Sequence, residues 1–452
     1  MAFKLGTIGT LVLLLLIPLG LLQSRLNERL RTRNQAISEI TRTWGSEQFV
    51  AGPFLQVPYT ATVMVRKDVV VNGEVVKTEV PSRVKRTACF LPSDYVVQCK
   101  LDPSERYRGI YKAVVYRGDF TIRGAFARPD FTEWKIADTD VLWDEAALMI
   151  AVTDLRGVTN ALSFNLGGKE LPLRPGTPFA GFPNTLRAHV PAGVLPGGLL
   201  KEAGSAQDVA FSFALGLNGS GGTRIAPLGL QTRASFSAPW PDPNFQGAFL
   251  PTARQISAAG FTAQWQVAYY GRGYPQAWLS GEGNDSINSM LIEKTAFGVD
   301  LYSPVDSYRL VERSVKYGIL FIVLIFTGFF LFETLGGLRI HAMQYTLVGA
   351  ALCLFYLTLL ALSELMAFGT AYLIGAVAAG GLVTFYSASV LKGAKRAGII
   401  AVELAVIFTF LYTTLQLQDY ALLLGTVGLF ISLGVVMYAT RNVDWYSQGS
   451  RR

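Results

Sequence analysis

The 452-residue chain has two histidines and three cysteines, and this scarcity excludes several kinds of site. With only His189 and His341, a three-histidine zinc site is impossible, and no H-E-x-x-H sequence occurs. No G-x-S-x-G motif supplies a nucleophile for His189. The Gly167-Gly168-Lys169 stretch lacks the earlier glycine of a phosphate-binding loop. We therefore expect no metal, no cofactor and no enzymatic activity.

Charged residues are missing from six long stretches, although the chain carries a net charge of +8. A helix needs about 20 apolar residues to cross the hydrocarbon core of a bilayer. We therefore predict one N-terminal and five C-terminal transmembrane helices, and the last five contain no proline that would break them. The six stretches are residues 5–24, 317–332, 342–363, 365–391, 404–418 and 420–440.

The sequence between the first and second apolar stretches has a different character. Leucine, isoleucine and tryptophan recur at helical spacing after residue 25, and from residue 49 valine-rich and aromatic runs alternate with glycine turns. The fold class that we predict is an α+β membrane protein with a large all-β, sandwich-like domain, either undivided or in two subdomains. We assign residues 1–24 to an anchor, 25–48 to a stalk helix, 49–315 to the β-rich domain, 316–446 to a five-helix bundle and 447–452 to a tail.

Four segments of the central domain are predicted to form pairs of strands. Asn72-Gly73 lies between two valine-rich runs, and both residues tolerate the positive φ angles of a hairpin turn. Residues 109–130, 208–240 and 260–278 combine aromatic and β-branched residues with internal glycines, so we read each of them as a further strand pair.

Cys89 and Cys99 flank nine residues that read as a possible hairpin. If the domain lies outside the cytoplasm, a disulfide between them is plausible, and two buried thiols are the alternative. Cys353 lies inside an apolar stretch, where we expect it to be a packing residue.

Orientation follows from lysine and arginine in the short loops between spans. Cationic residues lie in alternate loops and in the tail, whereas the loops around Glu364 and Asp419 contain none. This pattern predicts cytoplasmic termini and a periplasmic β-rich domain. Arginines 25, 29, 31 and 33 oppose this orientation, but a long domain can cross the membrane largely regardless of charge. The cationic residues are Arg339, Lys392, Lys395, Arg396, Arg441, Arg451 and Arg452.

Several polar residues of the bundle are candidates for function. Glu403 lies at membrane depth, where an ionisable group is either functional and paired or protonated. In FLFETLGGLRIHAMQY, Glu333 closes a span, Gly336-Gly337 make the turn and His341 opens the next span. Glu333, His341 and Gln344 are therefore expected either to meet at one mouth of the bundle or merely to mark a turn between spans.

Long stretches of the chain resemble the CreD family of inner-membrane proteins. These stretches include KYGILFIVLIFTGFFLFETLGGLRIHAMQYTLVGAALCLFYLTLLALSE (316–364), RGIYKAVVY (108–116) and PWPDPNFQGAFLP (239–251). The resemblance implies a Gram-negative inner-membrane protein associated with cell-envelope integrity, with expression tied to the CreBC sensor and regulator pair and to the β-lactam response. It carries no catalytic activity onto these residues. It marks a polar frame of Glu333, His341, Gln344, Tyr345, Tyr356 and Glu364.

Two functions are expected from these observations. In the first, a non-enzymatic envelope protein contacts membrane lipids and binds a periplasmic or inner-membrane protein partner, or a lipid in a groove between sheets. In the second, the polar residues of the bundle, Glu403 among them, form a small transporter or proton-coupled device. The positive charge lies mostly at membrane flanks, and without a nucleic-acid motif it indicates lipid headgroups rather than nucleic acid. The oligomeric state stays open.

Overall fold

The computed structural model describes residues 2–71, 74–191, 193–194, 208–280, 287–301, 307–336, 339–391, 393–417 and 420–441. The chain forms two compact units. The helical unit combines Met1–Gln35 with Val305–Arg452, and the β unit is Ala36–Pro304. The predicted turn residues Asn72, Gly73 and Gly337 and the predicted tail 447–452 lie outside the described residues.

Helix α1 (Ala2–Trp44) is a single helix of 43 residues, so the predicted anchor and stalk are continuous. Its buried leucines recur every three or four residues and form one stripe along the helix. Within the helical unit, this stripe meets glycines of two other helices. Leu15 lies against Gly349, and Leu19 lies against Gly318. The glycines let the leucine side chains approach closely, as small residues do between membrane helices.

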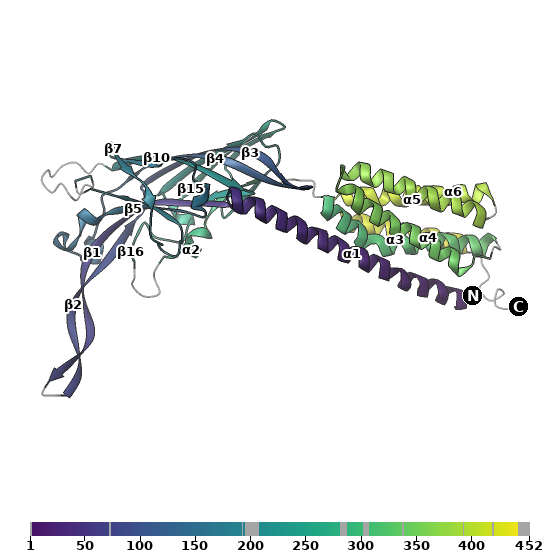
Figure 1. The fold of residues 1–452 in the computed structure, drawn as a ribbon, viewed down its shortest axis with the longest axis horizontal. Helices are drawn as coiled ribbons and strands as arrows, with labels where there is room; N and C mark the ends of the chain where they lie inside the picture. The colour runs from purple at the N-terminus through teal and green to yellow at the C-terminus, as the bar shows by residue number, and fades with distance from the viewer. Residues whose placement is uncertain are drawn as a thin grey trace. The chain divides into compact units, whose positions relative to one another are not determined.

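Five further helices complete the helical unit (Figure 1). Among the described residues, six helices are long and apolar enough to cross a membrane, as predicted. Helix α4 packs against α3 and α5, and α6 packs against α3, α5 and α7. Large apolar side chains remain exposed on their outer faces, which suits contact with lipid. The helices are α3 (Ser307–Gly336), α4 (Ala342–Ser363), α5 (Phe368–Val390), α6 (Ala394–Gln416) and α7 (Ala421–Thr440).

The β unit contains two sheets, which confirms the predicted β-rich architecture. The first sheet has the order β13 (Pro243–Gly247), β17 (Phe297–Leu301), β11 (Gly222–Ile225), β1 (Gln48–Val71), β5 (Ala147–Val152), β9 (Thr185–His189) and β8 (Arg174–Pro175). In addition, β2 (Glu74–Phe90) pairs with β1, and β16 (Ala277–Ser280) pairs with β2. The second has the order β14 (Ala253–Ser257), β15 (Gly260–Ala268), β12 (Gln231–Ala238), β3 (Asp94–Arg108), β4 (Tyr111–Phe126), β10 (Val209–Ser220), β6 (Ser163–Leu166) and β7 (Lys169–Pro172). A short helix, α2 (Ser289–Glu293), precedes β17.

Buried side chains join the two sheets. Apolar residues of both form one cluster, and two buried tyrosines of the second sheet bond to backbone of the first. The Tyr95 hydroxyl donates to the Gly52 carbonyl at 2.7 Å, and the Tyr116 hydroxyl donates to the Gly222 carbonyl at 2.8 Å. Buried apolar side chains of the two sheets pack against one another in this cluster, and the lipid groove between the sheets stays a prediction.

The pairing predicted for three segments is wrong, although the strands exist. Residues 109–130 hold the single strand β4. A side chain at Gly124 would collide with the Asp94 carbonyl and the Phe211 ring. That glycine serves close packing rather than a turn. In residues 208–240, β10 pairs with β4 and β6 while β12 pairs with β3 and β15. In residues 260–278, β15 and the start of β16 belong to different sheets.

The predicted hairpin between Cys89 and Cys99 is also wrong. Cys89 lies on β2 of the first sheet, opposite Gln56, and Cys99 lies on β3 of the second sheet, opposite Phe120. The chain between them crosses from one sheet to the other. Both cysteines are buried and free, so the possible disulfide is not formed.

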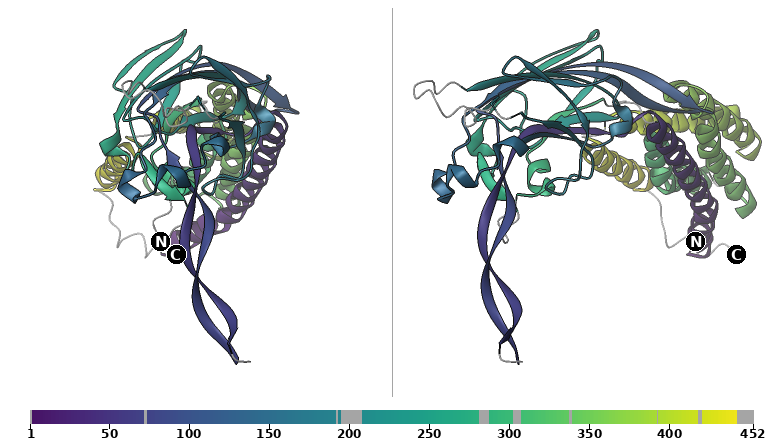
Figure 2. Two further views of the ribbon diagram at one scale, coloured as in Figure 1. Left: turned by 90° about the vertical axis from the view of Figure 1, so that its left-hand side faces the viewer. Right: turned by 60° about the vertical axis from the view of Figure 1, so that its left-hand side comes forward.

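Strands β1 and β2 continue beyond the first sheet as a two-stranded ribbon (Figures 1 and 2). They pair continuously from Leu55 opposite Phe90 to Val71 opposite Glu74. Strand β5 pairs with β1 no further than Gln56, and β16 pairs with β2 no further than Thr87. We call residues 60–71 and 74–85 the β1–β2 arm. At about 3.4 Å per residue, the arm is about 40 Å long.

Candidate functional site

The predicted polar residues of the helical unit form separate groups, the first of which we call the Lys4 cluster (Lys4, Glu333, Ile340 and Tyr345). Lys4 Nζ donates to Glu333 Oε1, the Ile340 amide donates to the same oxygen at 3.2 Å, and the Tyr345 hydroxyl donates to Glu333 Oε2 at 3.2 Å. The Glu333 side chain is 7% exposed. A buried carboxylate needs such partners, so the cluster ties α1 to α3 and α4.

His341 and Gln344 form a capping box at the start of α4. His341 Nδ1 accepts a hydrogen bond from the Met343 amide at 3.2 Å, and Gln344 Oε1 accepts one from the His341 amide at 3.0 Å. These bonds satisfy amides that a helix start leaves without intrahelical partners. Glu333 therefore bonds to the backbone of Ile340, one residue before His341. The side chains of His341 and Gln344 instead cap the start of α4.

Glu364 belongs to a second polar group at the other end of α3 and α4, which we call the Glu364 cluster (Arg29, Tyr308 and Glu364). The Tyr308 hydroxyl donates to Glu364 Oε1 at 3.1 Å, and Arg29 Nε lies 3.5 Å from the same oxygen. The Arg33 guanidinium lies over the Tyr308 ring, 5.8 Å from its centroid. Helix α1 is therefore joined to the bundle by an ion pair near each end of its contact.

Glu403 belongs to neither of these polar clusters. Its carboxylate lies against Gly328 of α3, where a side chain on that glycine would overlap both carboxylate oxygens. No hydrogen bond or ion pair to Glu403 occurs among the residues that the structure describes. Gly328 precedes Glu333 by five residues, or about 7.5 Å of helix. Tyr356 is buried and packs against Gly318, again as part of the α3–α4 contact.

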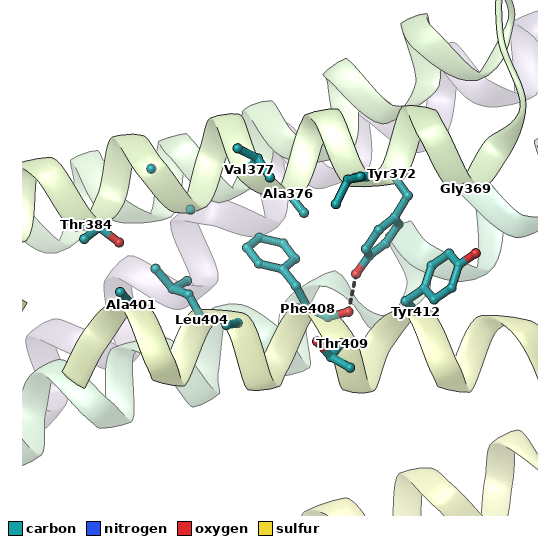
Figure 3. Close-up of a pocket in the computed structure, with 14 residues that line it drawn as sticks. Gly369, Tyr372, Ala376, Val377, Thr384, Ala401, Leu404, Phe408, Thr409 and Tyr412 are labelled. Carbon is teal, nitrogen blue, oxygen red and sulfur yellow. Dashed lines mark hydrogen bonds between the residues drawn. The ribbon is translucent and has the colours of Figure 1, made fainter. Parts of the chain in front are cut away.

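A groove between α5 and α6 is a feature that the sequence analysis missed (Figure 3). It has a volume of about 660 Å³ and is lined mainly by apolar atoms. Aromatic side chains of both helices face it, and the Tyr372 hydroxyl donates across it to the Phe408 carbonyl at 2.7 Å. The residues used below are Gly369, Tyr372, Gly380, Thr384, Phe408 and Tyr412.

A sequence signal for this groove exists. Ala376, Gly380 and Thr384 repeat every four residues on α5, and Ala401 and Ala405 do so on α6. Small residues at this spacing normally allow two membrane helices to touch. Here the same residues line an open space, because the Phe408 ring is the nearest group to Gly380, 3.7 Å from where a side chain would start.

Polar chemistry in the β unit centres on Asp154, which the sequence analysis did not single out. Its carboxylate accepts from Arg156 Nε at 2.9 Å and from Arg156 Nη2 at 2.8 Å, and the Ser46 amide lies 3.4 Å away. The hydrogen bonds from the Arg156 side chain lower the pKa of Asp154 to about 2, although partial burial opposes the shift. The Ser46 hydroxyl also lies 3.5 Å from the Asp154 carboxylate, and the cluster joins the end of α1 to the loop after β5.

The cysteines and possible metal ligands add no further site. Burial raises the pKa of both the Cys89 and the Cys99 thiol, so neither is a ready nucleophile. Among the described residues, no group of three or more histidine, cysteine, aspartate and glutamate side chains is arranged to hold a metal ion.

Comparisons with known proteins identify the family of this chain. The profile of the family named Inner membrane protein CreD matches residues 1–446. The Inner membrane protein CreD of Escherichia coli (strain K12) is 31% identical over 449 residues, which cover 98% of this chain and 94% of that protein. The match spans both units, the Lys4 cluster and the groove. The chain therefore belongs to the CreD family of inner membrane proteins.

Proposed function

We propose that this chain is a non-enzymatic inner-membrane protein that supports the cell envelope by binding a protein partner through its periplasmic β unit. The observation that carries the proposal is the β1–β2 arm. A two-stranded ribbon alone is only marginally stable in water, and both of its outer edges have unpaired backbone groups. Such an edge binds an extended segment of another protein by strand addition.

The charges of the arm are nearly balanced. Residues 60–85 include five cationic and three acidic residues. Two of the cationic residues sit at its base, where Arg83 lies 3.8 Å from Asp140 and Lys85 pairs with Glu145. The remaining three cationic and three acidic residues of the arm balance one another, so backbone strand addition rather than net charge carries the proposal. The charged residues are Arg66, Lys67, Asp68, Glu74, Lys77, Glu79, Arg83 and Lys85.

Photocrosslinking tests this proposal in the full chain. Benzoylphenylalanine replaces Met64, which is 63% exposed on the arm, and Ile256, which is 49% exposed on β14, serves as the matched control. We expect a Met64 adduct whose partner peptide is an extended segment of another protein, and no such adduct at Ile256. Equal adducts at both positions, or an adduct between two copies of the arm, would contradict the proposal.

Shortening the arm tests its role in the cell. Ala61 and Val84 lie opposite each other, so replacing residues 62–83 by Asn-Gly closes a shorter hairpin. We expect this variant to insert and fold as before but to leave cells as sensitive to detergent as cells that lack the protein. If cells with the shortened arm are as resistant to detergent as wild-type cells, the arm is not required for the function.

The proposed orientation places both termini in the cytoplasm. The cationic residues Arg339, Lys395 and Arg396 support it, because short loops rich in lysine and arginine stay cytoplasmic. Lys4 and Glu333 form an ion pair, so the N-terminus lies at the same end of the bundle as the loop that contains Arg339. A phosphatase reporter should be active after Asp419 and inactive after Gly393, and the opposite result would reverse the orientation.

A proton-coupled device is a second candidate, favoured by Glu403. An ionisable side chain at membrane depth without a partner among the described residues is costly unless it has a function. If the bundle moves protons, Glu403→Gln in proteoliposomes should abolish the flux driven by a pH gradient. The control, Glu312→Gln, removes an ion pair to Lys316 on the same helix as Gly328. Equal flux in both variants, or none in the wild type, would exclude this function.

A further inference from the structure

The groove between α5 and α6 has dimensions that fit one hydrocarbon chain. It extends from Gly369 to Thr384 along α5, which is about 22 Å at about 1.5 Å per residue. With a volume of about 660 Å³, its mean cross-section is about 30 Å². A groove of this length and volume has room for one extended acyl chain.

The two ends of the groove differ in polarity. Gly369 is the second residue of α5, and Tyr412 lies four residues before the end of α6. This end of the groove therefore lies near the membrane surface. The Tyr412 hydroxyl has no hydrogen-bond partner among the residues that the structure describes, whereas the neighbouring Tyr372 hydroxyl bonds to Phe408. An unpaired hydroxyl at a helix end can donate to the ester or phosphate oxygens of a lipid.

We infer that this groove is a binding site for one acyl chain of a membrane phospholipid, with the polar head of that lipid at Tyr412. Both helices cross the membrane, so the apolar molecules that reach the groove are the chains of the surrounding bilayer. The volume lies within the range of about 300–1,000 Å³ found for small-molecule sites. The site is independent of the β1–β2 arm and of the polar clusters.

Photolabelling of the full chain in bilayers tests the inference. The probe is a phosphatidylethanolamine whose acyl chain has a diazirine, present as a small fraction of unlabelled phosphatidylethanolamine vesicles. After irradiation, digestion and mass spectrometry locate the labelled residues. We expect the label to concentrate on groove residues such as Gly380 and Phe408, above the level on α7, which exposes most of its surface.

Matched variants separate a specific site from general lipid contact. Gly380→Leu fills the groove, and its Cβ would lie 3.7 Å from the Phe408 ring, an ordinary contact that the fold tolerates. We expect it to reduce groove labelling at least fivefold. Ala378→Leu adds the same side chain on an exposed face of α5 outside the groove and should change nothing. Tyr412→Phe should lower labelling about two- to tenfold, as expected for one hydrogen bond.

Four results would overturn the inference. The first is labelling in proportion to exposed apolar surface on every helix. The second is labelling that Gly380→Leu leaves unchanged. The third is a crosslink from the groove to a helix of another protein or of a second copy. The fourth is groove labelling by diazirine-bearing palmitate but not by the phospholipid, which would assign the site to free fatty acid.

Discussion

At the scale of single residues, most of the polar side chains that suggested chemistry hold helices together. Glu333 accepts three hydrogen bonds from three segments, and His341 and Gln344 start a helix. Sequence alone identified these residues but not their roles. Two of the three partners of Glu333, Lys4 and Tyr345, lie on other helices, so their contacts depend on how the helices pack. Glu403 remains a candidate for a function. Its carboxylate packs against Gly328, and it has no hydrogen-bond or ion-pair partner among the described residues.

The Lys4 cluster predicts a large stability effect from a small change. Glu333→Gln removes the charge that Lys4 needs, and we expect the free energy of unfolding to fall by about 1–3 kcal/mol. The control Glu312→Gln on the same helix breaks an i,i+4 pair to the exposed Lys316 and should cost less than about 0.5 kcal/mol. Thermal unfolding of the purified chain in detergent measures both, and equal shifts would show that Glu333 has no special role.

Asp154 predicts an acid-sensitive contribution in the β unit. Its folded-state pKa of about 2 lies below the ordinary value of 3.8, so its contribution is complete above about pH 4 and is lost as the pH falls towards 2. Arg156 is largely exposed, and solvent screening reduces the contribution to about 1 kcal/mol. Denaturant unfolding between pH 2 and 5 should show this loss in the wild type and a flatter profile in Asp154→Asn.

At the scale of helices and strands, the sequence predicts the elements better than it predicts their partners. The apolar stretches gave all six membrane helices, since composition decides membrane insertion. The strands were found too, but the strand pair predicted for residues 109–130 was wrong, because Gly124 packs against Asp94 and Phe211 of distant strands, which the local sequence does not show. The stalk helix was expected to continue from the first membrane span, and the single helix α1 confirms this.

Two substitutions of His341 at the start of α4 distinguish a capping role from a role in proton chemistry. His341→Ala removes the cap and should destabilise the helix start by about 1 kcal/mol, whereas His341→Asn should restore most of that loss because asparagine also caps helices. Hydrogen exchange at the Met343 amide measures the effect. A failure of asparagine to restore protection would mean that the imidazole has a role beyond capping.

At the scale of the whole molecule, the division into two units was only partly visible in the sequence. The change in composition predicts a boundary near residue 49, but the β unit begins at Ala36. The reason is a small cluster in which Ile37, Ile40 and Trp44 of α1 pack on Ala113 and Val115 of β4. Helical periodicity showed an apolar face on this segment, but not the sheet that covers it.

This boundary predicts which piece of the chain folds alone. Residues 36–304 form a compact unit with its own core, so we expect them to unfold cooperatively in solution without the membrane helices. A version that begins at residue 46 loses the cluster around Ile40 and should be less stable by about 2–5 kcal/mol. Denaturant unfolding compares the two. Equal stability would show that the helical segment does not belong to the β unit.

The ion pair between Lys4 and Glu333 also sets an order of events during synthesis. The two residues are 329 positions apart, and at about 5–20 residues per second a ribosome needs roughly 15–65 s to make the second after the first. During that interval the first membrane helix has no partner, and the whole β unit emerges and has time to fold. The bundle closes last, around a helix that was inserted at the beginning.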